Sequence, residues 1–133
     1  MNWDSRLNDL GVHYVEPPNA RWKCTAVEYQ DETQSGGRHH IFFSVVDATG
    51  KPLAGIPCHM DWDGRTGAEP QPTMATDAGG KANIAMYAKI DPGLKNGPYY
   101  AFIDNREVSG SVRGLGLTNE LPVCFLVTFQ KVS

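Results

Sequence analysis

The sequence has few of the features that mark membrane, nucleic-acid-binding or secreted proteins. No apolar run approaches the roughly 18 residues of a membrane span. Twelve Lys and Arg residues against fifteen Asp and Glu residues give a formal net charge of −3. Because duplex binding depends on clustered basic side chains, this balance argues against nucleic acid as a partner. The N-terminus has neither a basic region nor an apolar run, so we expect no cleaved signal peptide and no membrane partner.

Cysteine is scarce as well. Cys24, Cys58 and Cys124 are an odd set, each lies within an apolar run, and their spacing matches no metal-binding motif. A free cysteine behaves as a small buried hydrophobe. We therefore predict buried free thiols, with no metal and no cofactor.

The usual catalytic patterns are also missing. The sequence contains no Gly-x-Ser-x-Gly motif. The segment 61–64 begins like a calcium loop, but Arg65 occupies the next ligand position and no closing Glu follows at the required distance. We therefore expect a protein that is not an enzyme.

The adjacent pair His39 and His40 is the most conspicuous candidate for metal binding. Neighbouring side chains on a strand point to opposite faces, so the two imidazoles are not expected to hold one metal ion. We predict structural roles, with one ring turned inward and hydrogen-bonded to loop backbone and the other exposed. His13 and His59 lie at no spacing that adds a metal site.

The sequence does contain β-strand patterns separated by tight turns. Residues 39–47 are rich in β-branched and aromatic side chains, and apolar and polar residues alternate over 56–63. Gly50 lies in the turn that joins these two segments, and Gly79 lies in a second turn over 76–81. Glycine is favoured where the chain reverses, so both are predicted to be structural residues.

Further strands are predicted along the rest of the chain. They cover 21–29, 82–87, 99–103 and 123–132, while 109–117 indicates either a bulged strand or an ordered loop. Spacings of four and three between Trp3, Leu7 and Leu10 predict a short helix within a helical and extended N-terminal arm, 1–20. Together these patterns predict an all-β fold for one domain, 1–133: an antiparallel β-sandwich of about seven strands with a short N-terminal helix.

Candidate binding residues lie next to the longest predicted loop and on the aromatic strands. Residues 63–72 are polar and rich in Gly and Pro, so we expect an exposed loop that begins beside Trp62 and Asp63. If Met86, Tyr99 and Ala101 face the core, alternation turns Tyr87, Tyr100 and Phe102 outward as an aromatic strip. Such a strip suits either sugar stacking or a subunit interface.

Several segments resemble known sandwich modules. Residues 45–57, 76–82 and 99–103 resemble Ig-like and transthyretin-like accessory domains of bacterial and phage surface proteins. Residues 3–12, 35–42, 114–117 and 125–130 are similar to a sandwich module appended to bacterial cell-wall-lytic and other secreted proteins, with relatives in phage genomes. The resemblance implies a non-catalytic attachment domain.

Two functions follow as expectations. The first is a phage virion structural protein, a capsid or tail decoration or fibre-associated protein, whose partners are other subunits in a homo-oligomer or virion shell. The second is a carbohydrate-binding module that recognises bacterial cell-wall or surface glycans. The corresponding locations are the virion, after assembly in the host cytoplasm, and the extracellular cell wall.

Overall fold

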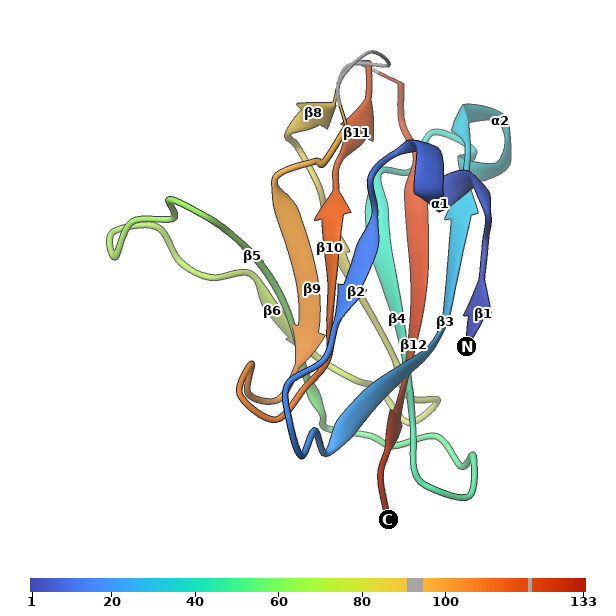
Figure 1. Ribbon diagram of the computed structural model, residues 1–133, viewed down its shortest axis with the longest axis vertical. Coiled ribbons are helices and arrows are strands. Elements are labelled where there is room, and N and C mark those ends of the chain that lie inside the picture. Colours follow the sequence, from blue (N-terminus) through green and yellow to red (C-terminus); the bar gives the residue numbers. More distant parts are fainter. Residues whose placement is uncertain (91–94, 120) are drawn as a thin grey trace.

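The predicted β-sandwich is confirmed by a computed structural model, which describes residues 1–90, 95–119 and 121–133. Two five-stranded sheets pack face to face, and a two-stranded sheet lies at one end (Figure 1). Apolar side chains from both sheets form the layer between them. The strands are more numerous and shorter than the sequence pattern indicated.

The first sheet has its longest strands at its centre. Its order is β1 (Asn2–Trp3), β3 (Trp22–Gln30), β12 (Cys124–Lys131), β4 (His40–Val46) and β7 (Lys81–Ala85). Strand β12 is antiparallel to β3 but parallel to β4, and β1 is parallel to β3. Two of the four pairings in this sheet are therefore parallel. Alternation within a strand carries no information on the direction of its neighbours.

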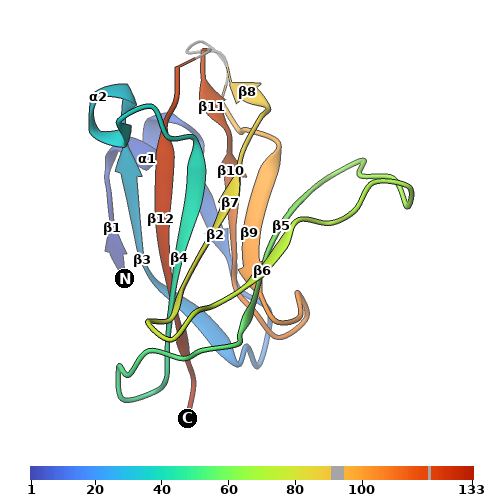
Figure 2. The same ribbon diagram turned by 180° about the vertical axis from the view of Figure 1, so that it is seen from behind.

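The second sheet is antiparallel throughout. Its order is β2 (His13–Val15), β10 (Ser111–Leu115), β9 (Tyr99–Ile103), β5 (Pro57–Trp62) and β6 (Thr73–Ala75). The two-stranded sheet pairs β8 (Lys89–Ile90) with β11 (Leu117–Thr118) in parallel. Along one side of the sandwich the edge strands β7 and β6 approach each other, and the Asn83 N–H lies 3.4 Å from Met74 Sδ (Figure 2).

The core follows the period of two that the sequence displays. In β12, Phe125, Val127 and Phe129 are at most 1% exposed. In β3 the apolar pattern changes phase, because the pairing with β12 shifts between Thr128 and Phe129. A bulge of this kind leaves one residue unpaired and transfers the inward face to the next position. The buried residues of β3 are therefore Trp22, Cys24, Val27 and Tyr29.

The two strands predicted on either side of a turn, β4 and β5, are both present, but they belong to different sheets. The chain turns at Gly50, which has φ +91° and donates its N–H to Asp47 O over 3.0 Å. It then crosses the sandwich before β5 begins. The turn was predicted correctly, because turn residues act locally, whereas the identity of the paired strand depends on distant residues.

The second turn depends on Gly80 rather than on the predicted Gly79. Gly80 has φ +73°, and a Cβ added there would lie 2.5 Å from Val45 O. Gly79 has no positive φ, and its N–H is bonded to Asp77 Oδ1 at 2.9 Å. Sequence could not separate the two adjacent glycines, because the close approach comes from β4.

The N-terminal arm is part of both sheets. Strand β1 extends the first sheet and β2 extends the second, while helix α1 (Arg6–Asp9) lies between them and buries Leu7 completely. The helix was predicted and the two strands were not. A second helix, α2 (Glu32–Ser35), lies between β3 and β4.

The cysteines of the chain are free and buried, as predicted. Burial raises the pKa of the Cys24 and Cys58 thiols to about 12, so both stay protonated at neutral pH. In the part of the chain that the structure describes, neither helix is long and apolar enough to span a membrane.

Candidate functional site

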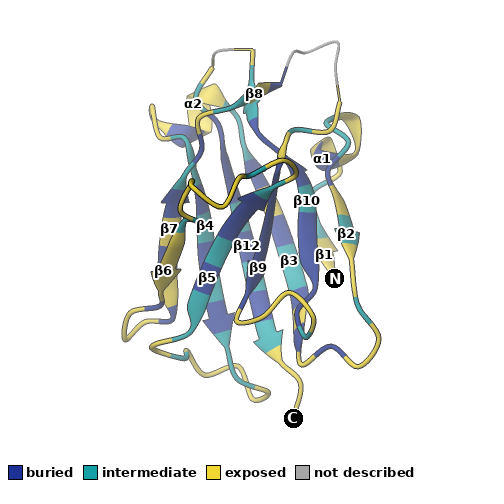
Figure 3. Ribbon diagram, turned by 90° about the vertical axis from the view of Figure 1, so that its left-hand side faces the viewer, coloured by how far each residue is buried: buried dark blue, intermediate teal, exposed yellow. Residues whose placement is uncertain are grey.

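The outer surface of the second sheet carries two neighbouring depressions, of about 400 and 370 Å³. One is lined by His13, Asp63, Asn96, Gly97, Pro98, Tyr99, Tyr100, Arg113 and Gly114. The other is lined by His59, Asp61, Arg65, Gln71, Phe102, Asp104, Asn105, Arg106 and Glu107. Figure 3 views this side of the molecule, with β9 buried between more exposed neighbours. We call the surface that carries Arg65, Arg106 and Arg113 the arginine face.

Tyr100 lies at the centre of the arginine face. Alternation along β9 turns Tyr100 outward, yet its side chain is only 4% exposed because two guanidinium groups cover it. The Arg113 guanidinium lies 4.2 Å from the ring centroid, and that of Arg106 lies 5.6 Å from it and donates to the phenol oxygen. Burial raises the pKa of Tyr100 and Asp61 adds to the rise, against the opposing effect of the two arginines. Tyr100 is thus a neutral platform that holds cations in place.

Phe102 is covered in a similar way. The ring of His59 on the neighbouring strand β5 packs against it at a centroid distance of 5.0 Å. The Nε2–H of His59 donates to Asp104 O at 2.9 Å, because a carbonyl oxygen can only accept. The Nδ1 of the same ring lies 2.8 Å from Thr73 Oγ1. Contacts at both ring nitrogens fix the imidazole over Phe102.

Asp61 anchors the long loop that follows β5. Its carboxylate accepts from Arg65 Nε at 2.7 Å, from Trp62 N at 2.8 Å and from Gln71 Nε2 at 3.1 Å. Burial raises the pKa of Asp61, but the hydrogen bonds from Arg65 and Trp62 outweigh it and hold the pKa below its usual value. Arg65 also donates to Glu69 O over 2.9 Å. These bonds tie both ends of the projecting loop, 63–72, to the sheet (Figure 1).

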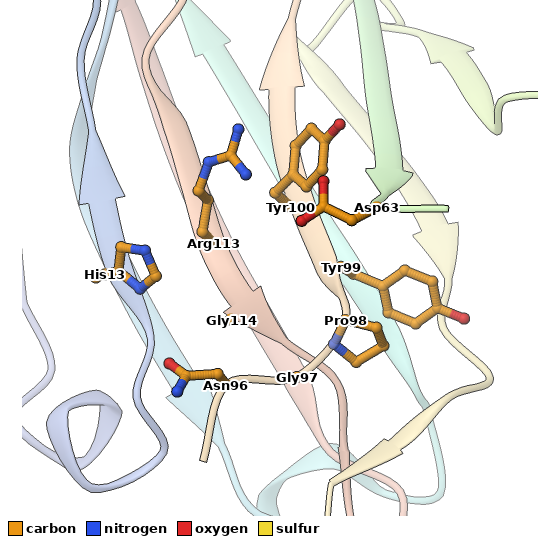
Figure 4. Close-up of a pocket in the computed structure, with 9 residues that line it drawn as sticks. All are labelled: His13, Asp63, Asn96, Gly97, Pro98, Tyr99, Tyr100, Arg113 and Gly114. Atoms are coloured by element: carbon orange, nitrogen blue, oxygen red, sulfur yellow. The ribbon is translucent and has the colours of Figure 1, made fainter. Parts of the chain in front are cut away.

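The larger depression gathers polar side chains from distant parts of the chain (Figure 4). His13 comes from β2, Asp63 from the start of the loop, Asn96 from the segment before β9, and Arg113 from β10. Among the described residues Arg113 forms no salt bridge. Its guanidinium therefore keeps donors for a bound group, while His13 directs Nδ1 to Gly11 O at 3.0 Å.

A bulge in β10 shapes this depression. The pairing of β10 with β9 shifts between Arg113 and Leu115. The intervening Gly114 has φ +84°, and a Cβ there would lie 2.6 Å from Gly11 O. Of the two structures considered for 109–117, a bulged strand and an ordered loop, the bulged strand is correct.

The predicted aromatic strip does not exist as a surface. Tyr100 and Phe102 share the arginine face but are buried, Tyr100 beneath two arginines and Phe102 beneath the His59 ring. Tyr87 is 74% exposed and lies elsewhere, 5.4 Å from the His39 ring. Trp62 packs edge-to-face on Tyr99 at 5.6 Å, toward the core. Strand alternation predicted the direction of the β9 side chains correctly. It did not predict that Arg106, Arg113 and His59 cover them.

Two of the candidate binding residues named from the sequence, Asp63 and Tyr100, line the larger depression. The other polar groups there, His13, Asn96 and Arg113, were not identified from the sequence. Arg113 had a usable signal, because it is the one charged residue in the glycine-rich apolar run 109–117. His13 and Asn96 had none, since only the fold brings them to this surface.

The prediction that the two adjacent histidines point to opposite faces is wrong. Their ring centroids are 5.0 Å apart, because His39 precedes β4 and is not bound by strand alternation. One ring is hydrogen-bonded to backbone as predicted, since the Nδ1–H of His39 donates to Met86 O at 2.8 Å, but the other ring, that of His40, is half-buried rather than exposed. Burial, the neighbouring His39 and Arg38 lower the pKa of His40. No group of three or more metal-binding side chains is found within the described ranges.

Comparison with known proteins adds no relative. No model of a known protein family matches the chain, and no curated protein is detectably similar to it in sequence.

Proposed function

We propose that this protein is a non-catalytic attachment module of a phage particle, which binds another structural subunit through its arginine face. The observation that carries the proposal is the fixed array of arginines around Tyr100. Arg106 and Arg113 stack on the tyrosine ring, and Arg65 is held by Asp61. Arginine and tyrosine are the side chains that contribute most to protein–protein binding energy.

The array is ordered before a partner arrives. A side chain that is already fixed loses little conformational entropy on binding, so its contacts add more to the affinity. Arg113 is held by the ring of Tyr100 and keeps its donors free of any salt bridge within the described residues. A carboxylate of the partner matches the paired donors of a guanidinium. A phage particle is proposed as the setting from the sequence-based resemblance alone, because no family model and no curated protein matches the chain.

A second function has one observation in its favour. The larger depression is lined by Asp63, Asn96, His13 and Arg113, which are planar polar groups suited to sugar hydroxyls. Stacking on Tyr100, a usual source of sugar affinity, is blocked because its ring is 4% exposed. Glycan binding is therefore the weaker candidate.

The test is co-expression of the chain with the products of the genes that flank its own, one at a time, followed by size-exclusion chromatography. We expect a stable complex with a structural subunit, and we expect Arg106→Glu with Arg113→Glu to abolish it. The matched control is Arg21→Glu with Lys51→Glu, which makes the same charge change at exposed positions away from the two depressions.

Three outcomes contradict the proposal. In the first, the complex still forms with the Arg106→Glu, Arg113→Glu variant. In the second, the complex is lost with the control double variant as well. The third is no complex with any neighbour but co-sedimentation with purified bacterial cell walls that Asp63→Ala weakens, which supports glycan binding instead.

A further inference from the structure

The outer surface of the first sheet also contains a depression, of about 420 Å³, on the side of the sandwich away from the arginine face. It is lined by Ala26, Glu28, Phe42, Phe43, Ser44, Lys81, Ala82, Asn83, Leu126, Val127 and Thr128. Its floor is formed by Ala26, Phe42 and Leu126, which are each partly exposed. We call this surface the apolar face.

The strand register orders these residues into two rows. The first row runs Glu28, Leu126, Phe42, Asn83 across β3, β12, β4 and β7. The second row runs Ala26, Thr128, Ser44, Lys81 across the same strands. The apolar side chains are therefore central, with an acid on the β3 side and a base on the β7 side.

The two charged residues lie far apart within one molecule. Three strand spacings separate their strands, roughly 14 Å. Both side chains are exposed, Lys81 contacts Ser44 Oγ, and Glu28 forms no salt bridge among the described residues. The face thus presents unmatched charges of opposite sign on either side of a largely apolar centre, where the Arg38 guanidinium lies 5.2 Å from the centroid of the Phe42 ring.

We propose that the apolar face binds a second copy of this chain in a twofold-symmetric dimer. A twofold axis lying between two facing sheets, close to the direction of β12 and β4, exchanges the β3 side of one copy with the β7 side of the other. Leu126 of each copy then faces Phe42 of the other, and Glu28 of each copy comes within reach of Lys81 of the other. A surface that is complementary to itself in this way is what an isologous interface requires.

The charge arrangement selects this occupant over others. An unrelated partner has no reason to match an acid and a base related by the symmetry of a dimer, whereas a second copy matches both at once. The proposal uses the opposite side of the sandwich from the proposed attachment surface. It therefore stands or falls independently of the proposed function.

Sedimentation velocity of the purified chain tests the dimer at concentrations from about 1 to about 100 µM, where modest interfaces associate. We expect a reversible dimer. Glu28→Lys alone and Lys81→Glu alone are each expected to weaken it about tenfold, because symmetry turns each substitution into two repulsive pairs. The double variant Glu28→Lys with Lys81→Glu restores the attraction and is expected to dimerise within about threefold of the original chain.

The matched control is Glu107→Lys, which makes the same charge change on the arginine face and is expected to leave the dimer unchanged. Leu126→Asp places a charge at the centre of the apolar face and is expected to abolish the dimer. Circular dichroism shows that each variant is folded before it is compared. A monomer at every concentration, or a folded double variant that does not recover, overturns the proposal.

Discussion

The two outer faces of the sandwich are built from the same strand alternation, yet they differ in how fully their aromatic residues are covered. On the arginine face, Tyr100 and Phe102 are 4% exposed because Arg113, Arg106 and His59 lie across them. On the apolar face, the Arg38 guanidinium lies 5.2 Å from the centroid of the Phe42 ring and His40 stacks on the ring at 5.6 Å, yet Phe42 remains partly exposed beside Leu126. An outward direction and an exposed ring are therefore separate properties of a strand residue.

The difference originates in the neighbouring strands. Strand β9 lies between β10, which supplies Arg113, and β5, which supplies His59. Strand β12 lies between β3 and β4. Leu126 is paired with Phe42 of β4, and Thr128 is paired with Ala26 of β3 and Ser44 of β4. The side chains on the paired strands, together with arginines from the adjoining loops, decide how fully an outward aromatic is covered. One face thus becomes a fixed polar surface, and the other keeps more exposed apolar area.

The largest expected effect concerns the layer that supports both faces. Phe129 in β12 is fully buried. We expect Phe129→Ala to lower the free energy of unfolding by about 3 to 5 kcal/mol, because it removes apolar contacts and leaves a cavity. Urea denaturation monitored by tryptophan fluorescence measures this, with the exposed Val132→Ala as the control. A loss below about 1 kcal/mol contradicts a core shared by the two sheets.

The next prediction compares one phenylalanine from each face. Phe102→Ala is expected to cost about 3 kcal/mol of unfolding free energy, because the ring is buried. Phe42→Ala is expected to cost only about 1 kcal/mol in dilute monomer, because less of that ring leaves water on folding. Urea denaturation of both variants at low protein concentration makes the comparison. Equal losses would remove the distinction between the faces.

A smaller effect is expected from Asp61, which anchors the projecting loop to the arginine face. Its folded pKa is lowered, so its contribution to stability is present above the unfolded pKa of about 3.9 and is lost as the pH falls through the folded value. Asp61→Asn is expected to cost about 2 kcal/mol at neutral pH, because it weakens charged hydrogen bonds.

The stability difference between the original chain and Asp61→Asn should therefore shrink as the pH is lowered below about 4. Urea denaturation of the two proteins at several pH values measures this. A difference that stays constant with pH shows that the carboxylate charge does not stabilise the loop.

The smallest effect concerns the stacking of Arg113 on Tyr100. Arg113→Met keeps the length of the side chain and removes its charge, and we expect a loss of about 0.5 to 1 kcal/mol. Because Arg113 lowers the pKa of Tyr100, the substitution should raise this pKa further. Titration of tyrosinate absorbance detects the change, and Tyr100→Phe identifies which transition belongs to that residue. An unchanged transition contradicts the stacking.

Local patterns predicted much of the fold. The alternation of Phe125, Val127 and Phe129 identified β12, and the Asp-x-x-Gly turn identified Gly50, because both depend on neighbours in sequence. The parallel pairing of β12 with β4 was not predictable in this way. It depends on which strands meet after the chain crosses between sheets.

Much less of the candidate site was predictable. Asp63 was identified because it begins a polar loop, and Tyr100 was given the correct direction with the wrong exposure. The exposure depends on Arg106 and Arg113, whose positions over the ring are set by the fold. His13 lines the same depression as Arg113, although the two residues are about a hundred positions apart in the sequence.

The most direct test of two distinct faces is sedimentation equilibrium of the original chain beside one variant of each face. The variants are Arg106→Glu with Arg113→Glu, and Leu126→Asp. We predict that the original chain and the arginine variant form dimers of the same stability and that Leu126→Asp is a folded monomer. Loss of the dimer in the arginine variant, with Leu126→Asp still dimeric, would contradict the assignment of self-association to the apolar face.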